Sequence, residues 1–317
     1  MCQQRNTSSR PVLVTGAAGQ VGGIGRLVVE TLRDRGVPVR AVVRSDDARA
    51  AALRLRGAEV AVADLTRPEQ VVPILDGCIR GYFGMSVSPS YLEATLVMAA
   101  AARARSNLEL LVNMSQMTVS QMDLTRTTDS PQHRQHWLGE QALNWSGVPV
   151  AHIRPTVFQE NPLFMALVAK SIAESGTLRL PFGTGRTSPV AARDVAEVIA
   201  AILLDPKPYV GQVVELTGPR SVDLYELANE YSSALYRPVT YVPVPLEDWG
   251  DELSKRGLPD HLFHHLLTMA ELHAANRYDR HTDAIARILG RAPTSLRETV
   301  IGNGELFQPS GSASQWQ

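Results

Sequence analysis

The stretch that decides the fold is PVLVTGAAGQVGGIG, residues 11–25 of a 317-residue chain. A compact apolar run over residues 11–15 predicts a strand, and glycines and a helical pattern follow it directly. This order is typical of a dinucleotide-binding βαβ unit, because the turn and the helix N-terminus can hold a pyrophosphate. Gly16 permits the tight turn, Gly19 lets the backbone approach the phosphates, and either Gly22 or Gly25 allows close packing of helix on strand. The alternative is a glycine-rich turn without a ligand.

Apolar strand patterns alternate with helical patterns through the rest of the first half, and the second half adds two helices and a late strand before it becomes mainly helical. We expect further strands over residues 37–44, 59–63, 81–85, 108–114, 148–154 and 212–216. We expect helices over residues 25–35, 46–56, 68–75, 91–105, 136–145, 161–174 and 192–204. Alternation of this kind gives parallel βαβ units. It predicts an α/β fold, with a Rossmann-type doubly wound parallel sheet and a smaller, mainly helical C-terminal cap.

The domain boundaries follow from these patterns. We expect a flexible N-terminus over residues 1–10 and an NAD(P)-binding Rossmann domain over residues 11–155, its sheet completed by residues 190–218. A substrate or cap region is expected over residues 156–189 and 219–301. Residues 302–317 are rich in Gly, Ser and Gln and are expected to form a flexible tail.

Composition excludes several classes of protein. The 31 Lys and Arg balance 32 Asp and Glu, so there is no basic excess to neutralise nucleic-acid phosphates. The two cysteines, Cys2 and Cys78, cannot form a disulfide framework. There is no signal-peptide core, and no apolar run reaches the roughly 20 residues of a membrane span. We therefore expect a cytoplasmic protein that binds neither nucleic acid nor membrane, and the sequence leaves open a homodimer.

The end of the second predicted strand bears on the choice of cofactor. Arg44 and Ser45 stand where an arginine accommodates the 2′-phosphate of NADP, so NADP(H) is favoured over NAD(H). Asp46 and Asp47 follow directly and could instead bond the ribose hydroxyls of NAD. Asp64, after the third predicted strand, is a candidate for the adenine amino group. A turn or capping role is its alternative.

Several motifs together resemble the NmrA-like family, an atypical branch of the short-chain dehydrogenase/reductase superfamily. They are TGAAGxVG, the AVVR strand end, VADL, SGVPVAHIRPTVFQEN, VAARDVAEVIAAIL and QVVELTGPRSVDLYELA, which span nearly the whole chain. The resemblance implies an NADP(H)-binding Rossmann domain and a small C-terminal domain that shapes a substrate cleft. The family includes quinone and isoflavonoid-type reductases, and also regulators that bind dinucleotide without turning it over.

The resemblance also implies site residues. Those expected to face the pyrophosphate are Gly16, Gly19, Gln20, Val21 and Gly22, with Ala18 in the same loop. Arg44 would contact the 2′-phosphate. Asp64, the adenine candidate named above, and its neighbour Leu65 are further candidate cofactor-binding residues. Met85 and Ser86 are expected near the nicotinamide ribose, and Pro155 and Thr156 beside the nicotinamide ring.

One departure from the superfamily concerns the proton donor. The Tyr-x-x-x-Lys pair is replaced by His136-x-x-x-Glu140, and an imidazole could act as acid or base near neutral pH. The alternative is a histidine in a polar helix face. Ser115 lies near the position of the substrate-orienting serine, although Gln116 or Thr118 could align equally well, and a turn role for Ser115 is open.

We therefore predict an NADP(H)-dependent oxidoreductase. Hydride would pass between the nicotinamide and a small apolar or aromatic carbonyl, quinone or enone, because methionines and phenylalanines follow the strand ends. The alternatives are a non-catalytic NADP(H) sensor, and an enzyme that uses His136 for dehydration or isomerisation. His261 and His265 share a helix face, but without the glutamate of HExxH or a nearby cysteine we expect no metal site.

Overall fold

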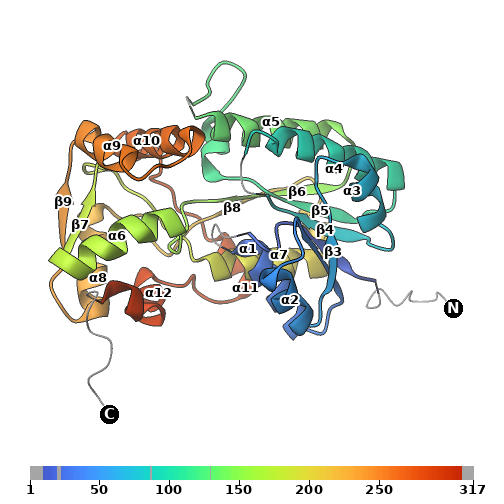
Figure 1. The fold of residues 1–317 in the computed structure, drawn as a ribbon, viewed down its shortest axis with the longest axis horizontal. Coiled ribbons are helices and arrows are strands. Elements are labelled where there is room, and N and C mark those ends of the chain that lie inside the picture. Colours follow the sequence, from blue (N-terminus) through green and yellow to red (C-terminus); the bar gives the residue numbers. More distant parts are fainter. Residues whose placement is uncertain (1–9, 20–22, 86–87, 129, 309–317) are drawn as a thin grey trace, which may run out of the picture. The chain divides into compact units, whose positions relative to one another are not determined.

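The computed structural model describes residues 10–19, 23–85, 88–128 and 130–308 (Figure 1). Most of the two predicted flexible ends therefore lies outside the described residues. The chain divides into two compact units. We call Met1–Val119, His133–Arg154 and Val195–Glu215 the N-terminal unit, and Ser120–Gln132, Pro155–Asp194 and Leu216–Gln317 the C-terminal unit. None of the helices in the described part of the chain is long and apolar enough to cross a membrane.

The N-terminal unit is built on a sheet that has seven strands among the described residues. Their order is β3-β2-β1-β4-β5-β6-β8. The strands are β1 (Val12–Val14), β2 (Val39–Val43), β3 (Glu59–Val62), β4 (Arg80–Phe83), β5 (Leu110–Met114), β6 (Val150–Pro155) and β8 (Val213–Leu216). β1 pairs in parallel with both β2 and β4, so the strand order reverses at β1. Open α/β sheets bind ligands at the carboxyl ends of the strands beside such a reversal.

Helices cover both faces of this sheet (Figure 1). One face carries α3 (Pro68–Ile74), α4 (Tyr91–Arg105) and α5 (Pro131–Trp145), and the other carries α1 (Ile24–Asp34), α2 (Ala48–Leu55) and α7 (Ala192–Leu204). The apolar stripe of α1 is fully buried at Val28, Val29 and Leu32. Leu13 and Phe83 are buried in the core with α3 and α4. Apolar strands buried on both faces are what a parallel sheet requires.

The C-terminal unit combines a small sheet with helices. β7 (Thr177–Leu180) and β9 (Thr240–Pro243) pair in parallel. The helices are α6 (Pro162–Ser175), α8 (Leu224–Leu235), α9 (Leu246–Ser254), α10 (Asp260–Ala274), α11 (Ala284–Leu289) and α12 (Leu296–Gly302). Short 3₁₀ turns are η2 (Met117–Gln121), η3 (Lys207–Tyr209) and η4 (Gly304–Phe307). Leu180, Tyr231, Trp249 and Phe307 are buried in one apolar cluster that forms the core of this unit.

The predicted fold class is confirmed, with three local differences. α5 begins at Pro131, five residues before the predicted start at residue 136. β7 and β9 were not predicted, because each has only four residues and they pair across about 60 residues of sequence. α8 was also missed, although its sequence carries a signal. Asp223 and Glu226 form a capping box in which each side chain accepts a hydrogen bond from the other residue's backbone amide.

Candidate functional site

The glycine turn after β1 is held against the end of β4 by Thr15. The Thr15 hydroxyl donates to the carbonyl of Gly84 and accepts from its amide, both at 3.0 Å. Gly16 has a positive φ of 64°, and a Cβ there would lie 2.4 Å from the Gly84 oxygen. Only glycine fits this position, because both the conformation and the close approach exclude a side chain. The backbone at the carboxyl end of β1 is thereby left bare, as a phosphate-binding turn needs.

The glycine that packs helix on strand is Gly25. A Cβ on Gly25 would lie 2.4 Å from the oxygen of Gly16, so α1 lies directly against the turn. The helix starts at Ile24 behind Gly23, which has a φ of 60° and offers no capping side chain. The predicted phosphate contacts at Gln20, Val21 and Gly22 lie outside the described residues. Gly19 is exposed and Ala18 half-buried at the rim of the turn.

The two aspartates after β2 are engaged by arginines of α2. Asp46 bonds both terminal nitrogens of Arg54, at 2.7 and 2.9 Å. Asp47 bonds Arg49 and also accepts from backbone amides at the start of α2, and its hydrogen bonds with Arg49 lower its pKa to about 2. Arg44 is exposed and, among the residues that the structure describes, forms no hydrogen bond or ion pair. A guanidinium is thus available at the place predicted for the 2′-phosphate, with Ser45 exposed beside it.

Arg49 is a candidate cofactor residue that the sequence analysis missed. Its Nη1 donates to the carbonyl of Ala18 at 3.1 Å, which joins the start of α2 to the glycine turn. Its charge therefore stands beside the turn, five residues after Arg44. A second basic residue in the first turn of the helix after β2 was the available signal.

Asp64 and Leu65 follow β3, and both are half-buried. Asp64 Oδ1 accepts from the amide and the hydroxyl of Thr66, and the amide contact is the main reason that its pKa is lowered. Asp64 Oδ1 therefore stabilises the turn after β3, which agrees with the alternative of a turn role, and Oδ2 can still accept a hydrogen bond from a ligand. Met85 is half-buried after β4, and Ser86 lies outside the described residues.

His136, the candidate acid or base, lies buried on α5. Its Nδ1 is 3.0 Å from the hydroxyl of Tyr91 on α4, and the ring centroids are 4.7 Å apart. Tyr91 is itself buried, and burial raises the pKa of its hydroxyl. The residue that the superfamily pattern pointed to is therefore tied to a neighbouring helix. This contact favours a structural role for the ring.

Glu140, one turn further along α5, forms a buried ion pair with Arg154 of β6. Arg154 donates to both carboxylate oxygens, with Nε–Oε1 at 2.9 Å and Nη2–Oε2 at 2.5 Å. Burial by itself would raise the pKa of Glu140, but the hydrogen bonds and charge of Arg154 outweigh it and hold the pKa below its usual value. This pair anchors α5 to the edge of β6.

Ser115 lies at the carboxyl end of β5, where a substrate-orienting serine was expected. Its amide donates to Ile153 at 2.8 Å, so its position is fixed by β6. Its hydroxyl is near enough to Glu140 to contribute to the lowered pKa of that carboxyl, yet forms no well-aligned hydrogen bond among the described residues. Thr118 Oγ1 is likewise buried without a partner in the described structure. The end of β5 therefore offers polar groups that a ligand could satisfy.

Pro155 and Thr156, predicted to flank the nicotinamide, are both buried and belong to the C-terminal unit. The Thr156 hydroxyl donates to the Ser188 carbonyl at 2.6 Å, and this bond fixes the side chain. His265, which was considered as a metal ligand together with His261, bonds a serine. Its Nδ1 is 3.0 Å from the Ser130 hydroxyl, and the described residues contain no group of three or more potential ligands.

These observations fit a dinucleotide in the N-terminal unit. The turn at Gly16 admits no Cβ, a helix begins behind it, and Arg44 brings positive charge to the same end of the sheet, while Arg49 is paired with Asp47. A bare turn at a helix start can hold a pyrophosphate, and an unpaired guanidinium can hold a further phosphate.

Comparison with known proteins agrees with the motifs. The model of the NmrA-like family matches residues 8–300. An NAD(P)H azoreductase of Xenophilus azovorans is 27% identical over 291 residues, which cover 91% of this chain and 97% of the azoreductase. A (4-alkanoyl-5-oxo-2,5-dihydrofuran-3-yl)methyl phosphate reductase of Streptomyces griseus is 30% identical over 305 residues, or 94% and 99% of the two chains.

Among solved structures, an NADPH-dependent quinone oxidoreductase of Escherichia coli in complex with NADPH has the same fold. Its TM-score is 0.80 at 24% identity, and the match covers 92% of this chain and 99% of that one.

Proposed function

This chain belongs to the NmrA-like family, and we propose that it is an NADPH-dependent reductase that delivers hydride to a small apolar quinone, enone, carbonyl or azo acceptor. The two curated relatives that span its length are named as reductases, one of an azo compound and one of an unsaturated lactone that also carries a phosphate ester. The structural neighbour is named as a quinone oxidoreductase. All three acceptor types are conjugated and electron-poor, which supports a hydride acceptor of this class.

The choice of NADPH over NADH rests on which charged side chains after β2 are paired with one another and which are not. Asp46 and Asp47 are both paired with arginines of α2, so fewer of their oxygen lone pairs are left for the ribose hydroxyls of NADH. Arg44 is left to face a 2′-phosphate. A charge-assisted bond of this kind is worth about 1.5–3 kcal/mol, which is enough to decide between the two cofactors.

The chemistry needs little from the protein beyond position. Bound NADPH supplies the hydride, while the bare turn at Gly16 and the guanidinium of Arg44 hold the phosphates. A quinone yields a stable product anion, so its reduction requires no dedicated acid from the chain. The Tyr91–His136 contact is compatible with this, because quinone reduction does not require the His136 imidazole as a proton donor.

The direct test is a fluorescence titration with NADPH, NADH and NADP⁺ on wild type and Arg44→Ala. We expect NADPH to bind more tightly than NADH, and Arg44→Ala to weaken NADPH by about tenfold or more while leaving NADH unchanged. Arg126→Ala is the matched control, since Arg126 is also exposed but belongs to the C-terminal unit. Equal affinities for NADPH and NADH in wild type would contradict the proposed cofactor.

Turnover separates the reductase from its alternatives. We expect NADPH oxidation with a panel containing a quinone, an azo dye and an unsaturated lactone. NADPH binding without turnover on any of them would favour the sensor. His136→Ala tests the third alternative, because a non-redox step by this residue would disappear in the variant while hydride transfer would persist.

A further inference from the structure

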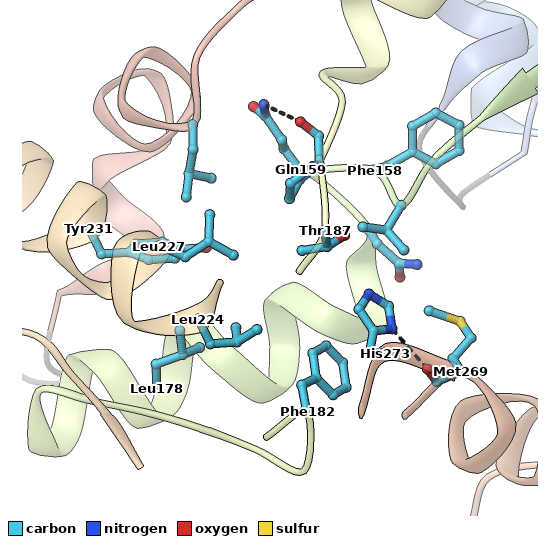
Figure 2. A pocket seen from close by; sticks show the side chains of 14 residues that line it. Phe158, Gln159, Leu178, Phe182, Thr187, Leu224, Leu227, Tyr231, Met269 and His273 are labelled. Carbon is cyan, nitrogen blue, oxygen red and sulfur yellow. Dashed lines mark hydrogen bonds between the residues drawn. The ribbon is translucent and has the colours of Figure 1, made fainter. Parts of the chain in front are cut away.

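The core of the C-terminal unit contains a narrow apolar cavity with two unsatisfied polar atoms. It lies among α8, α10 and the segments around residues 157–161 and 178–189, and its volume is about 30 Å³ (Figure 2). Leu178, Leu224, Leu227 and Met269 supply much of its apolar wall. A space of this size admits a hydroxyl group or a single water.

His273, at the end of α10, contributes the first polar atom. The ring is stacked between Phe182 and Tyr278, with centroid distances of 4.1 and 4.0 Å. Its Nδ1 lies 2.8 Å from the Met269 carbonyl (Figure 2), and because a carbonyl only accepts, Nδ1 carries the proton. Nε2 therefore holds a lone pair. It is buried and has no partner among the residues that the structure describes.

The protonation state of His273 agrees with this assignment. Burial lowers the pKa of the imidazole to about 4, even though the bond to Met269 works in the opposite direction. The ring is neutral at physiological pH, and its Nε2 accepts hydrogen bonds rather than donating them.

Thr187 contributes the second polar atom. Its backbone is fully paired, because its amide and carbonyl both bond Val222 at 2.8 Å. The side chain is 2% exposed, and Oγ1 has no partner in the described structure. The hydroxyl belongs to the cavity wall together with His273.

Close packing surrounds both groups. The loop that carries Thr187 packs on the end of α10 so closely that a Cβ on Gly185 would lie 1.8 Å from the His273 oxygen. Aromatic rings hold the imidazole on both faces. Buried polar groups in native proteins are almost always satisfied, so two such atoms at one cavity indicate that both bond a partner from outside the chain, a water or a ligand group.

We propose that this cavity receives a hydroxyl carried by an otherwise apolar substrate, which donates to His273 Nε2 and accepts from Thr187 Oγ1. A hydroxyl does both at once, whereas a carboxylate cannot donate to Nε2 and would leave its charge in an apolar wall. The rest of the molecule extends along Val157 and Phe158, which also line the cavity.

Val157 and Phe158 follow directly after Pro155 and Thr156 in the chain. Pro155 and Thr156 are the residues that we expect beside the nicotinamide. The selectivity for hydroxylated acceptors rests on the proposed reductase function, since it names the substrate class of that enzyme.

The test compares 4-hydroxyazobenzene with azobenzene, which differ only by the hydroxyl. Binding is measured by absorbance titration without cofactor, and reduction is measured with NADPH. We expect wild type to bind the hydroxylated dye about tenfold more tightly, the effect of one or two well-placed hydrogen bonds. In His273→Phe and in Thr187→Val the ratio between the dyes should fall toward one. His264→Gln, a change at an exposed histidine of the same helix, should keep the ratio.

A spectroscopic readout guards against misfolded variants. In wild type, phenol should shift the ¹⁵N resonance of His273 Nε2, since that nitrogen gains a hydrogen bond, and the resonances of exposed histidines should not move. Equal affinities of wild type for the two dyes, together with an unchanged ¹⁵N resonance of His273, would overturn the proposal and indicate that a water occupies the cavity. A preference that survives in both His273→Phe and Thr187→Val would overturn it as well.

Failure of the reductase function would appear differently. Neither dye would be reduced, yet the binding preference and its loss in His273→Phe would still support the pocket. Reduction of both dyes with no binding preference would support the reductase function and refute the proposal that the cavity binds a substrate hydroxyl.

Discussion

Two buried regions, one in each unit, differ in how their ionisable side chains are paired. Around β6 and α5 of the N-terminal unit, Glu140 is paired with Arg154, and His152 is bonded through both ring nitrogens, to Asn113 and Asn144. In the C-terminal unit, His273 is buried as deeply but keeps one ring nitrogen unsatisfied beside a cavity. The N-terminal unit has instead a bare backbone turn and the exposed guanidinium of Arg44, which we propose as the groups that hold the cofactor phosphates.

The difference shows which buried polar groups indicate function. A paired group such as Glu140 is accounted for by the fold, because its desolvation is offset by its partner. An unpaired group such as His273 Nε2 costs free energy until a ligand satisfies it. His136 drew attention in the sequence, yet its contact with Tyr91 places it with the paired groups.

The largest expected effect comes from breaking the Glu140–Arg154 pair. Arg154→Met leaves a buried carboxylate without a partner, and we expect the free energy of unfolding to fall by about 3–5 kcal/mol in urea titrations. The double variant Glu140→Leu/Arg154→Met should recover most of this loss. Arg54→Met, at an exposed pair with Asp46, should cost about 1 kcal/mol or less. A small effect of Arg154→Met would mean that Glu140 does not depend on Arg154 as its partner.

Acid should destabilise the protein partly through His273. Its pKa is lowered to about 4 in the folded protein, whereas an unfolded histidine titrates near about 6.5. Between these values the unfolded chain binds more protons, so the stability present above pH 6.5 is lost as pH falls toward 4, by about 3 kcal/mol for this residue.

The measurement is urea unfolding of wild type and His273→Phe across that pH range. The slope of the unfolding free energy with pH should be smaller in the variant by up to about 1.4 kcal/mol per pH unit. His265, whose pKa burial also lowers to about 4, should contribute separately. Identical slopes in the two proteins would mean that His273 is not held neutral.

Gly25→Ala tests the backbone surface of the N-terminal unit. The added Cβ would lie 2.4 Å from the Gly16 oxygen, so we expect a loss of about 1–3 kcal/mol of stability together with weakened NADPH binding. Gly302→Ala is the control, because no atom lies within 4 Å of a Cβ there. Unchanged NADPH affinity in Gly25→Ala would mean that the glycine turn does not contribute to cofactor binding.

The smallest effect compares two buried threonines of the C-terminal unit. Thr156→Val removes a hydroxyl that donates to Ser188, and we expect a loss of about 1–2 kcal/mol. Thr187→Val removes a hydroxyl without a partner, so without ligand it should be neutral or stabilising by about 1 kcal/mol or less. Equal losses in thermal unfolding would show that the Thr187 hydroxyl is satisfied, and the contrast between the paired groups and the cavity would weaken.

Much of the fold was predictable from the sequence. Each strand of the large sheet appears as an apolar run, and α4 and α7 begin and end at the predicted residues, because local periodicity and glycine turns are encoded by neighbours in sequence. β7 and β9 were not predicted, since their pairing depends on segments far apart.

The sequence by itself determined the dinucleotide-binding architecture and placed Arg44 at the end of β2. Only the tertiary structure decided what the neighbouring charges do: Arg49 and Arg54 engage Asp47 and Asp46, and Gly25 is the packing glycine. Only the tertiary structure brought His273 and Thr187 to one cavity. The reason is physical: helices and strands follow from contacts between near neighbours, whereas the pairing of a buried polar group depends on which distant segments pack around it.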